Sequence, residues 1–171
     1  MTKTHSFFNL KIIDMTDADV FFEAIRSGDN NKLVNLLSTN SNLVDLKDSR
    51  GFTPLIFATY FDNEEATKTL LEHNAKVDDK DALGNTALIG VCFKGNVSIA
   101  NKLIHSGANI NAVNNNGTTP LIFATTYGKE DIVKLLLDHG ADKSMKDHNG
   151  KTALDYATEK KFSNLVELLN N

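Results

Sequence analysis

Four glycines at a constant spacing constrain this chain more than any other feature of its sequence. Gly51, Gly84, Gly117 and Gly150 each follow the previous one by 33 residues, with no insertion or deletion between them. Threonine and leucine recur two and four positions after each glycine, and a pair of large aliphatic residues recurs later in each interval. A fixed period of about 20 to 50 residues indicates an array of stacked structural repeats.

Residues 114–140 show how one unit is expected to fold. The segment begins with an Asn-Gly pair, which is typical of a tight turn. Thr119 supplies a helix cap, and Pro120 suits the first helical turn because its missing N–H has no partner there. Apolar residues follow at helical spacing, Gly128 interrupts them, and a second apolar stripe runs to Gly140. The unit is therefore predicted to be a turn followed by two helices.

These units resemble the ankyrin repeat, which has about 33 residues and the signature T-P-L-H-x-A. The signature reads TPLIFA at 53–58 and 119–124, TALIGV at 86–91 and TALDYA at 152–157. The signature histidine is Ile or Asp in every unit, and proline is alanine in two units. The resemblance covers roughly residues 17–171. It implies an all-α solenoid of helix–turn–helix units joined by β-turn loops, with about five repeats including the caps.

We expect a single ankyrin-repeat domain over residues 16–171, preceded by an N-terminal extension over residues 1–15. The units are expected at 16–47 (N-terminal cap), 48–80, 81–113, 114–146 and 147–171 (C-terminal cap). Terminal repeats are atypical because one of their sides faces water. The apolar residues between Phe7 and Ile13 are expected to pack on the first unit, and the alternative is that they form a partner-binding tail.

Charge and composition exclude several classes of partner. The net charge is −4 and both signs are spread along the chain, whereas nucleic-acid binding needs clustered Lys and Arg. No apolar run approaches the roughly 18 residues of a membrane span, and the first residues lack the unbroken apolar run of a secretory signal. Cys92 is the only cysteine, so no internal disulfide forms. We expect a cytoplasmic protein with no nucleic-acid or membrane partner.

Candidates for chemistry are few. His73 and His139 occupy one repeat position two units apart, about 20 Å from each other in a stack of helices, and His105, one position earlier in its unit, is expected to point elsewhere. The acidic run 78–81 lacks the glutamate that a calcium loop needs at position 12. Cys92 stands where the repeat usually has alanine, which indicates a small packed thiol. We therefore expect no catalytic residue, no metal, no cofactor and no enzymatic activity.

The resemblance implies an extended surface that binds other proteins through the turn tips and the ends of the first helices. Aromatic and arginine side chains supply most interface hot spots. The candidate protein-binding residues at these positions are Arg50, Phe52, Tyr60, Phe61, Leu83, Phe93, Lys94 and Tyr127. Phe61 and Tyr127 also stand where the family often carries an aromatic residue that packs between repeats, so a packing role stays open for both.

The function expected from the sequence is a non-catalytic protein–protein interaction module that binds a protein partner through its concave face. One alternative is a regulatory subunit or inhibitor of a specific enzyme. Another is a self-associating structural protein whose aromatic patch forms a dimer interface. The expected state is a monomer, with the dimer as the alternative.

Overall fold

The structure is a computed structural model that describes residues 16–171. These residues form five pairs of α-helices and one 3-10 helix, and they contain no β-strand. The elements are α1 (Asp17–Ser27), α2 (Asn30–Thr39), η1 (Ser41–Asp45), α3 (Pro54–Tyr60), α4 (Glu64–Glu72), α5 (Ala87–Lys94), α6 (Val97–His105), α7 (Pro120–Thr126), α8 (Glu130–Asp138), α9 (Ala153–Glu159) and α10 (Ser163–Asn170). The expected N-terminal extension, and its packing on the first unit, lie outside the described residues.

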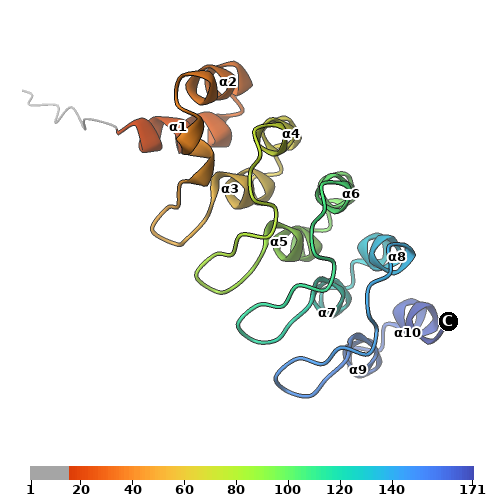
Figure 1. The fold of residues 1–171 in the computed structure, drawn as a ribbon. Helices are drawn as coiled ribbons and strands as arrows, with labels where there is room; N and C mark the ends of the chain where they lie inside the picture. Colours follow the sequence, from red (N-terminus) through yellow and green to blue (C-terminus); the bar gives the residue numbers. More distant parts are fainter. Residues whose placement is uncertain (1–15) are drawn as a thin grey trace, which may run out of the picture.

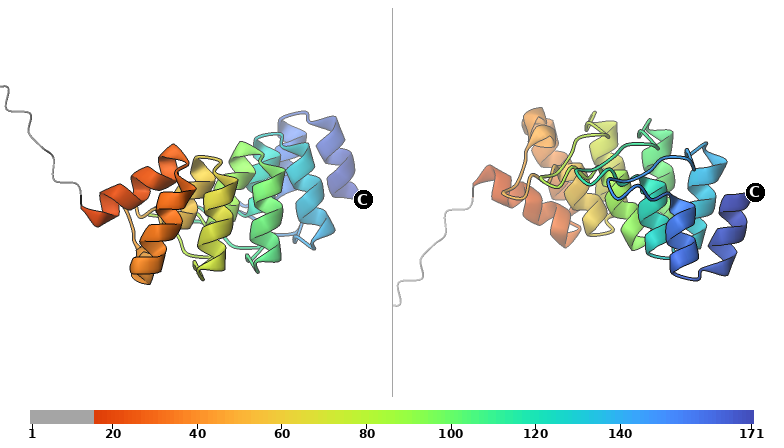
Figure 2. Two further views of the ribbon diagram at one scale, coloured as in Figure 1. Left: turned by 90° about the horizontal axis from the view of Figure 1, so that it is seen from above. Right: turned by 90° about the horizontal axis from the view of Figure 1, so that it is seen from below.

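The helices form two rows, and long hairpins project beside one of them (Figure 1). Each odd-numbered helix packs on the next, from α1 to α9, and each even-numbered helix packs on the next, from α2 to α10. The two further views show the same stacking along the array (Figure 2). We call the surface made by the hairpins and the odd-numbered helices the hairpin face. The predicted all-α solenoid of helix–turn–helix units is confirmed.

A threonine caps every odd-numbered helix of residues 16–171. Its hydroxyl accepts a hydrogen bond of 3.2 to 3.4 Å from the backbone N–H three residues later; the five caps are Thr16, Thr53, Thr86, Thr119 and Thr152. Pro54 and Pro120 occupy the first helical position of α3 and α7. A side-chain cap stabilises a helix by about 1 kcal/mol, so these threonines fix where the first helix of each unit begins.

An Asp or Asn side chain closes each hairpin. Asp48, Asp81, Asn114 and Asp147 occupy one repeat position, and Oδ1 of each accepts hydrogen bonds from the backbone N–H groups two and four residues later. The glycine three residues on donates its N–H to the backbone carbonyl of the same residue. These four glycines have φ between +71° and +78°. The expected unit boundaries fall on the four acceptor residues, and the boundaries themselves stay a prediction.

Backbone hydrogen bonds join each hairpin to the next. The pairs are Ala82 N–H to Arg50 C=O at 3.1 Å, Asn115 N–H to Leu83 C=O at 3.0 Å, and His148 N–H to Asn116 C=O at 3.0 Å. The hairpin glycines face this contact directly. A Cβ on Gly84 would lie 2.8 Å from the backbone nitrogen of Asn115, and a Cβ on Gly51 would lie 2.9 Å from that of Ala82. Glycine is therefore needed at these positions both for the positive φ and for the close approach of the two hairpin backbones.

The apolar core lies between the two rows of helices and runs through the whole array. Its repeated members are at most 2% exposed: Leu55, Leu88 and Leu121 from the signature, and Leu70, Leu103 and Leu136 from the second helices. Each fully buried aliphatic side chain contributes about 1.5–3 kcal/mol. Because each inner unit shares this core with both neighbours, it cannot keep it when separated from them.

The first unit departs from the others where it leaves α2. Its longer loop forms η1, which buries Leu43 and Val44 and packs against α2 and α3. This element is not predictable from the sequence, because two adjacent apolar residues are too few to show a helical period.

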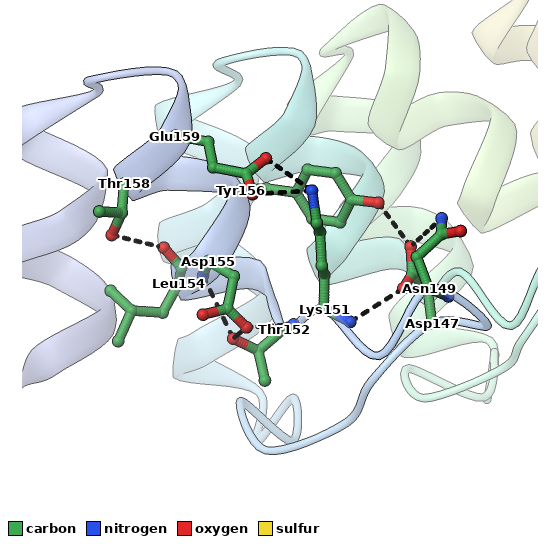
Figure 3. A network of polar contacts seen from close by, with 9 residues as sticks. All are labelled: Asp147, Asn149, Lys151, Thr152, Leu154, Asp155, Tyr156, Thr158 and Glu159. Atoms are coloured by element: carbon green, nitrogen blue, oxygen red, sulfur yellow. Dashed lines mark hydrogen bonds and ion pairs between the residues drawn. The ribbon is translucent and has the colours of Figure 1, made fainter.

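A polar network holds the last hairpin against α9 (Figure 3). Oδ1 of Asp147 accepts the backbone N–H groups of Asn149 and Lys151, and Oδ2 accepts the hydroxyl of Tyr156. Nζ of Lys151 lies 2.7 Å from Oε1 of Glu159. Burial alone would raise the pKa of Asp147, but the hydrogen bonds from Tyr156, Lys151 and Asn149 outweigh it and hold the pKa below its ordinary value.

The contact between hairpins predicts unequal effects for two equivalent substitutions. Gly84→Ala and Gly150→Ala both place a side chain at positive φ, which costs about 1–2 kcal/mol. Only the Cβ on Gly84 meets the next hairpin, whereas nothing lies within 4 Å of a Cβ on Gly150. We expect Gly84→Ala to lose a further 1–3 kcal/mol or so of unfolding free energy, measured by urea titration followed by circular dichroism. Equal losses would contradict the packing role of Gly84.

The network around Asp147 predicts a pH-dependent contribution to stability. A carboxylate whose pKa is lowered by folding stabilises the protein fully above its unfolded pKa of about 4, and this contribution is lost as the pH falls through the folded pKa. The variant Asp147→Asn carries the side chain that Asn114 has in its own hairpin, so it keeps the Oδ1 acceptor and does not titrate. We expect this variant to be less stable than wild type at pH 7 and the difference to shrink below pH 4 or so. Urea titrations at both pH values measure this, and a constant difference would refute it.

Candidate protein-binding groove

An apolar groove lies on the hairpin face, between two hairpins and the helices α3, α5 and α7. Its volume is about 310 Å³. Most of its lining is hydrophobic, with a few polar groups from the hairpin of residues 81–85 and from the helix ends. The lining residues that matter below are Phe52, Ile56, Tyr60, Asp81, Leu83, Ile89, Gly90, Phe93, Lys94, Phe123 and Tyr127.

The structure brings six of the eight candidate residues together at this groove: Phe52, Tyr60, Leu83, Phe93, Lys94 and Tyr127. Arg50 lies behind the groove wall, and Phe61 lies outside it. These residues come from three successive units, so the stacking of repeats creates the groove. Their role in binding stays a prediction.

One wall of the groove is built on α3. The rings of Tyr60 and Phe52 have centroids 5.8 Å apart, and the Arg50 guanidinium lies over the Phe52 ring, 4.2 Å from its centroid. Nη2 of Arg50 lies 2.7 Å from Oδ2 of Asp48. Burial alone would raise the pKa of Asp48, but the hydrogen bonds from Arg50 and from the N–H of Phe52 lower it overall. Arg50 therefore supports Phe52, and its charge is balanced by its own hairpin.

The opposite wall is an aromatic cluster shared by α5 and α7. The rings of Phe93 and Tyr127 meet edge to face at 4.6 Å, and Phe123 lies 6.3 Å from Phe93 and 5.4 Å from Tyr127. Edge-to-face pairs of this kind add about 0.5–1.5 kcal/mol beyond their buried area. Tyr127 thus packs between repeats and also lines the groove with a half-exposed ring.

Lys94 closes the end of the groove between these walls. Its Nζ donates to the backbone carbonyl of Tyr60 and forms an ion pair with Asp62, so it ties the end of α5 to the end of α3. A partly exposed ion pair contributes about 0–1 kcal/mol. Lys94 thus fixes the spacing of two units, and Asp62 balances its charge.

Phe61 lies outside the groove. Its ring packs against Phe57 at 4.8 Å and Tyr60 at 5.2 Å, while 41% of the residue stays exposed. Phe61 therefore contacts Tyr60 but does not itself line the groove.

Gly90 makes the central gap of the groove. It lies in α5 at the repeat position that α3, α7 and α9 fill with Phe57, Phe123 and Tyr156. A Cβ on Gly90 would meet nothing within 4 Å. Gly90 is not among the residues predicted from the sequence, although a signal is present: TALIGV has glycine where TPLIFA has phenylalanine. A missing aromatic ring between two repeats that keep theirs leaves space for another side chain.

The groove carries most of the exposed large hydrophobic side chains that the structure describes. Leu83 is 68% exposed, Tyr60 51%, Tyr127 48% and Phe93 47%. Single exposed apolar residues are ordinary, but several on one hollow surface mark an interaction site. The three other exposed large hydrophobic residues of the described chain, Val34, Phe61 and Val97, do not line the groove.

Other side chains with potential chemistry are accounted for by local structure. Cys92 is fully buried, and burial raises the pKa of its thiol, which keeps it protonated. The expectation that His105 points elsewhere is wrong, because its ring lies 5.7 Å from that of His139. Nδ1 of each ring lies 2.8 Å from the backbone carbonyl four residues earlier. In residues 16–171 no group of three or more His, Cys, Asp or Glu residues is placed to hold a metal ion.

Among the described residues, no helix combines the length and the apolar character needed to cross a membrane. A comparison with curated proteins gave no match. A family model described as ankyrin repeats (3 copies) matches residues 21–114 and 90–171. The two matched segments together take in the helix pairs, the hairpins and the groove, and the chain therefore belongs to the ankyrin repeat family.

Proposed function

We propose that this chain is a non-catalytic protein-interaction module whose groove on the concave hairpin face receives an apolar side chain of a protein partner. The observation that carries the proposal is the row of half-exposed aromatic rings around the gap at Gly90. Ankyrin repeat proteins generally act as protein–protein interaction modules and are typically non-catalytic. The only cysteine is a buried thiol, which fits the cytoplasm as the compartment we propose.

The chemistry of the groove indicates which partner groups fit. Its floor and walls are aliphatic and aromatic, while the cationic groups nearest to it, Arg50 and Lys94, are paired with Asp48 and Asp62. An apolar anchor therefore gains more there than a charged one, because burying a charge without a partner is costly. Aromatic anchors in desolvated pockets dominate the energy of many interfaces.

Phe57 and Leu83 show the difference between a position that the fold buries and one that it leaves exposed. Phe57, at the position equivalent to Gly90, is 8% exposed and belongs to the core. Leu83 at the hairpin tip is 68% exposed and lines the same groove as Gly90. Packing within the fold explains the first position, whereas no part of residues 16–171 buries the second. A regulatory subunit or inhibitor would use the same groove on an enzyme, and a self-associating protein would use it on a second copy.

Filling the gap predicts a loss of partner binding without a loss of stability. Gly90→Phe places in α5 the ring that α3 and α7 already carry, and Gly90→Ala is the matched control that leaves the gap open. Both remove a helical glycine, so we expect both variants to be at least as stable as wild type. For Gly90→Ala the free energy of unfolding should rise by about 0.5–1 kcal/mol. In affinity capture of a stoichiometric partner from lysate of the source cells, Gly90→Ala should behave as wild type and Gly90→Phe should capture nothing.

Equal capture by the two Gly90 variants would move the binding site away from the groove. Capture by neither variant nor wild type would remove the support for a partner, and a dimer seen by sedimentation of wild type alone would favour self-association.

A second prediction compares exposed apolar residues inside and outside the groove. Leu83→Ser removes the most exposed apolar side chain at the gap, while Val34→Ser removes an exposed side chain on α2. Since neither side chain is buried, both variants should keep the unfolding free energy within about 0.5 kcal/mol. We expect Leu83→Ser to weaken partner binding by about tenfold or more, equivalent to about 1.4 kcal/mol, and Val34→Ser to leave it unchanged. Calorimetric titration of the purified pair measures both, and equal weakening would contradict the assignment.

A further inference from the structure

We propose that this chain's own residues 8–12 lie extended across the hairpin face, with the ring of Phe8 in the gap left by Gly90. The proposed occupant is intramolecular. It follows from the shape of the gap and the sequence that precedes α1, and it does not depend on the partner-binding function proposed above. Its consequence is that a partner entering the groove has to displace Phe8.

The gap has the chemistry of a phenylalanine site. The neighbouring repeats place Phe57 and Phe123 at the position of Gly90, and both rings pack with further aromatic residues of their own repeats. In α5 the equivalent space is open and lies between Tyr60 on one side and Phe93 on the other. A phenyl ring supplied from elsewhere would restore the ring missing from the series.

The segment before α1 has a pattern that suits this site. Residues 7–13 read FFNLKII, and the described structure begins at residue 16. In an extended chain successive side chains point to opposite sides. Phe8, Leu10 and Ile12 therefore share one side, while the other side carries Phe7, the polar Asn9 and Lys11, and Ile13. An extended segment would press the wholly apolar side on the hairpin face and leave Lys11 in water.

The distance from Thr16 to the gap at Gly90 allows Phe8 to reach the gap only if the segment between Phe8 and Thr16 is extended. The α1 and α5 helices are separated by α3, so their axes are about 20 Å apart at 8–10 Å per step. Thr16 precedes the residue of α1 equivalent to Gly90 by seven helical positions, or about 10 Å along the axis. The straight path is thus about 22 Å, whereas the eight residues from Phe8 to Thr16 span up to about 26 Å when extended and about 12 Å when helical.

Charge favours the same docking. Residues 1–13 contain Lys3 and Lys11 and no Asp or Glu, so they carry +2, and the net charge of −4 leaves −6 on residues 14–171. Asp81 lines the groove, and no Lys, Arg or His of residues 16–171 forms an ion pair with it. Attraction between a basic segment and an acidic array draws the segment toward the array, and the apolar side chains then hold it at the groove.

Paramagnetic relaxation enhancement in the full-length chain tests the proposal. A nitroxide is attached to Thr4→Cys; Cys92, fully buried with a raised thiol pKa, does not react. The amide signals of Leu83, Gly90 and Phe93 report the arrival of the segment. Phe8→Ala removes the proposed anchor, and Phe7→Ala is the matched control on the other side of the segment. A mixture of isotope-labelled unmodified chains with unlabelled spin-labelled chains detects contact between two copies.

We expect the three amides to broaden in the single-chain sample, to recover with Phe8→Ala and to stay broadened with Phe7→Ala. Broadening confined to α1 and α2 would place the segment on the first unit and overturn the proposal. Equal effects of the two alanine variants would overturn the anchor, and broadening seen in the mixed sample at the same strength would assign the groove to a second copy instead. Because no partner is added, each result is independent of the partner-binding proposal.

Discussion

The hydrogen bonds between successive hairpins set the geometry on which the rest of the molecule depends. After the first hairpin, each hairpin donates a hydrogen bond from a backbone N–H to a carbonyl of the hairpin before it, as Asn115 does to Leu83 at 3.0 Å. This bond forms only because glycine at the turn brings the two backbones together without a Cβ between them. The pitch fixed in this way carries into both rows of helices, so that equivalent leucines stack into one continuous core.

Because the units are so regular, a residue that departs from the repeat changes the local packing. A glycine in place of the Phe57 and Phe123 equivalents removes a ring from a periodic stack, and the helix on either side cannot move inward because its own hairpin bonds hold the spacing. The space at Gly90 therefore stays open, lined by rings that would otherwise be covered. The rigid frame thus preserves an apolar hollow that a more deformable core would collapse.

The sequence located most of the groove residues but not the groove. Tyr60, Leu83 and Phe93 were identified one unit at a time from their positions in the repeat, and the structure brings them to one hollow. Phe61 occupies the same kind of position but does not line the groove, and its ring packs against Phe57 at 4.8 Å. The rings of His105 and His139 lie 5.7 Å apart although the two residues differ by one repeat position, because they stand at the ends of neighbouring helices. Relations between side chains of different units are not contained in the pattern of one unit.

By itself the sequence determined the helices, their caps and the stacking of units. The 33-residue spacing of glycines, the capping threonines and the recurring leucines are local signals repeated often enough to agree with one another. Only the tertiary structure decided which exposed aromatic side chains share a surface and where an absent side chain leaves a hollow. The reason is physical: helix formation and capping act between residues three or four apart, whereas the groove is made by rings from α3, α5 and α7 whose mutual positions exist only once the units are stacked.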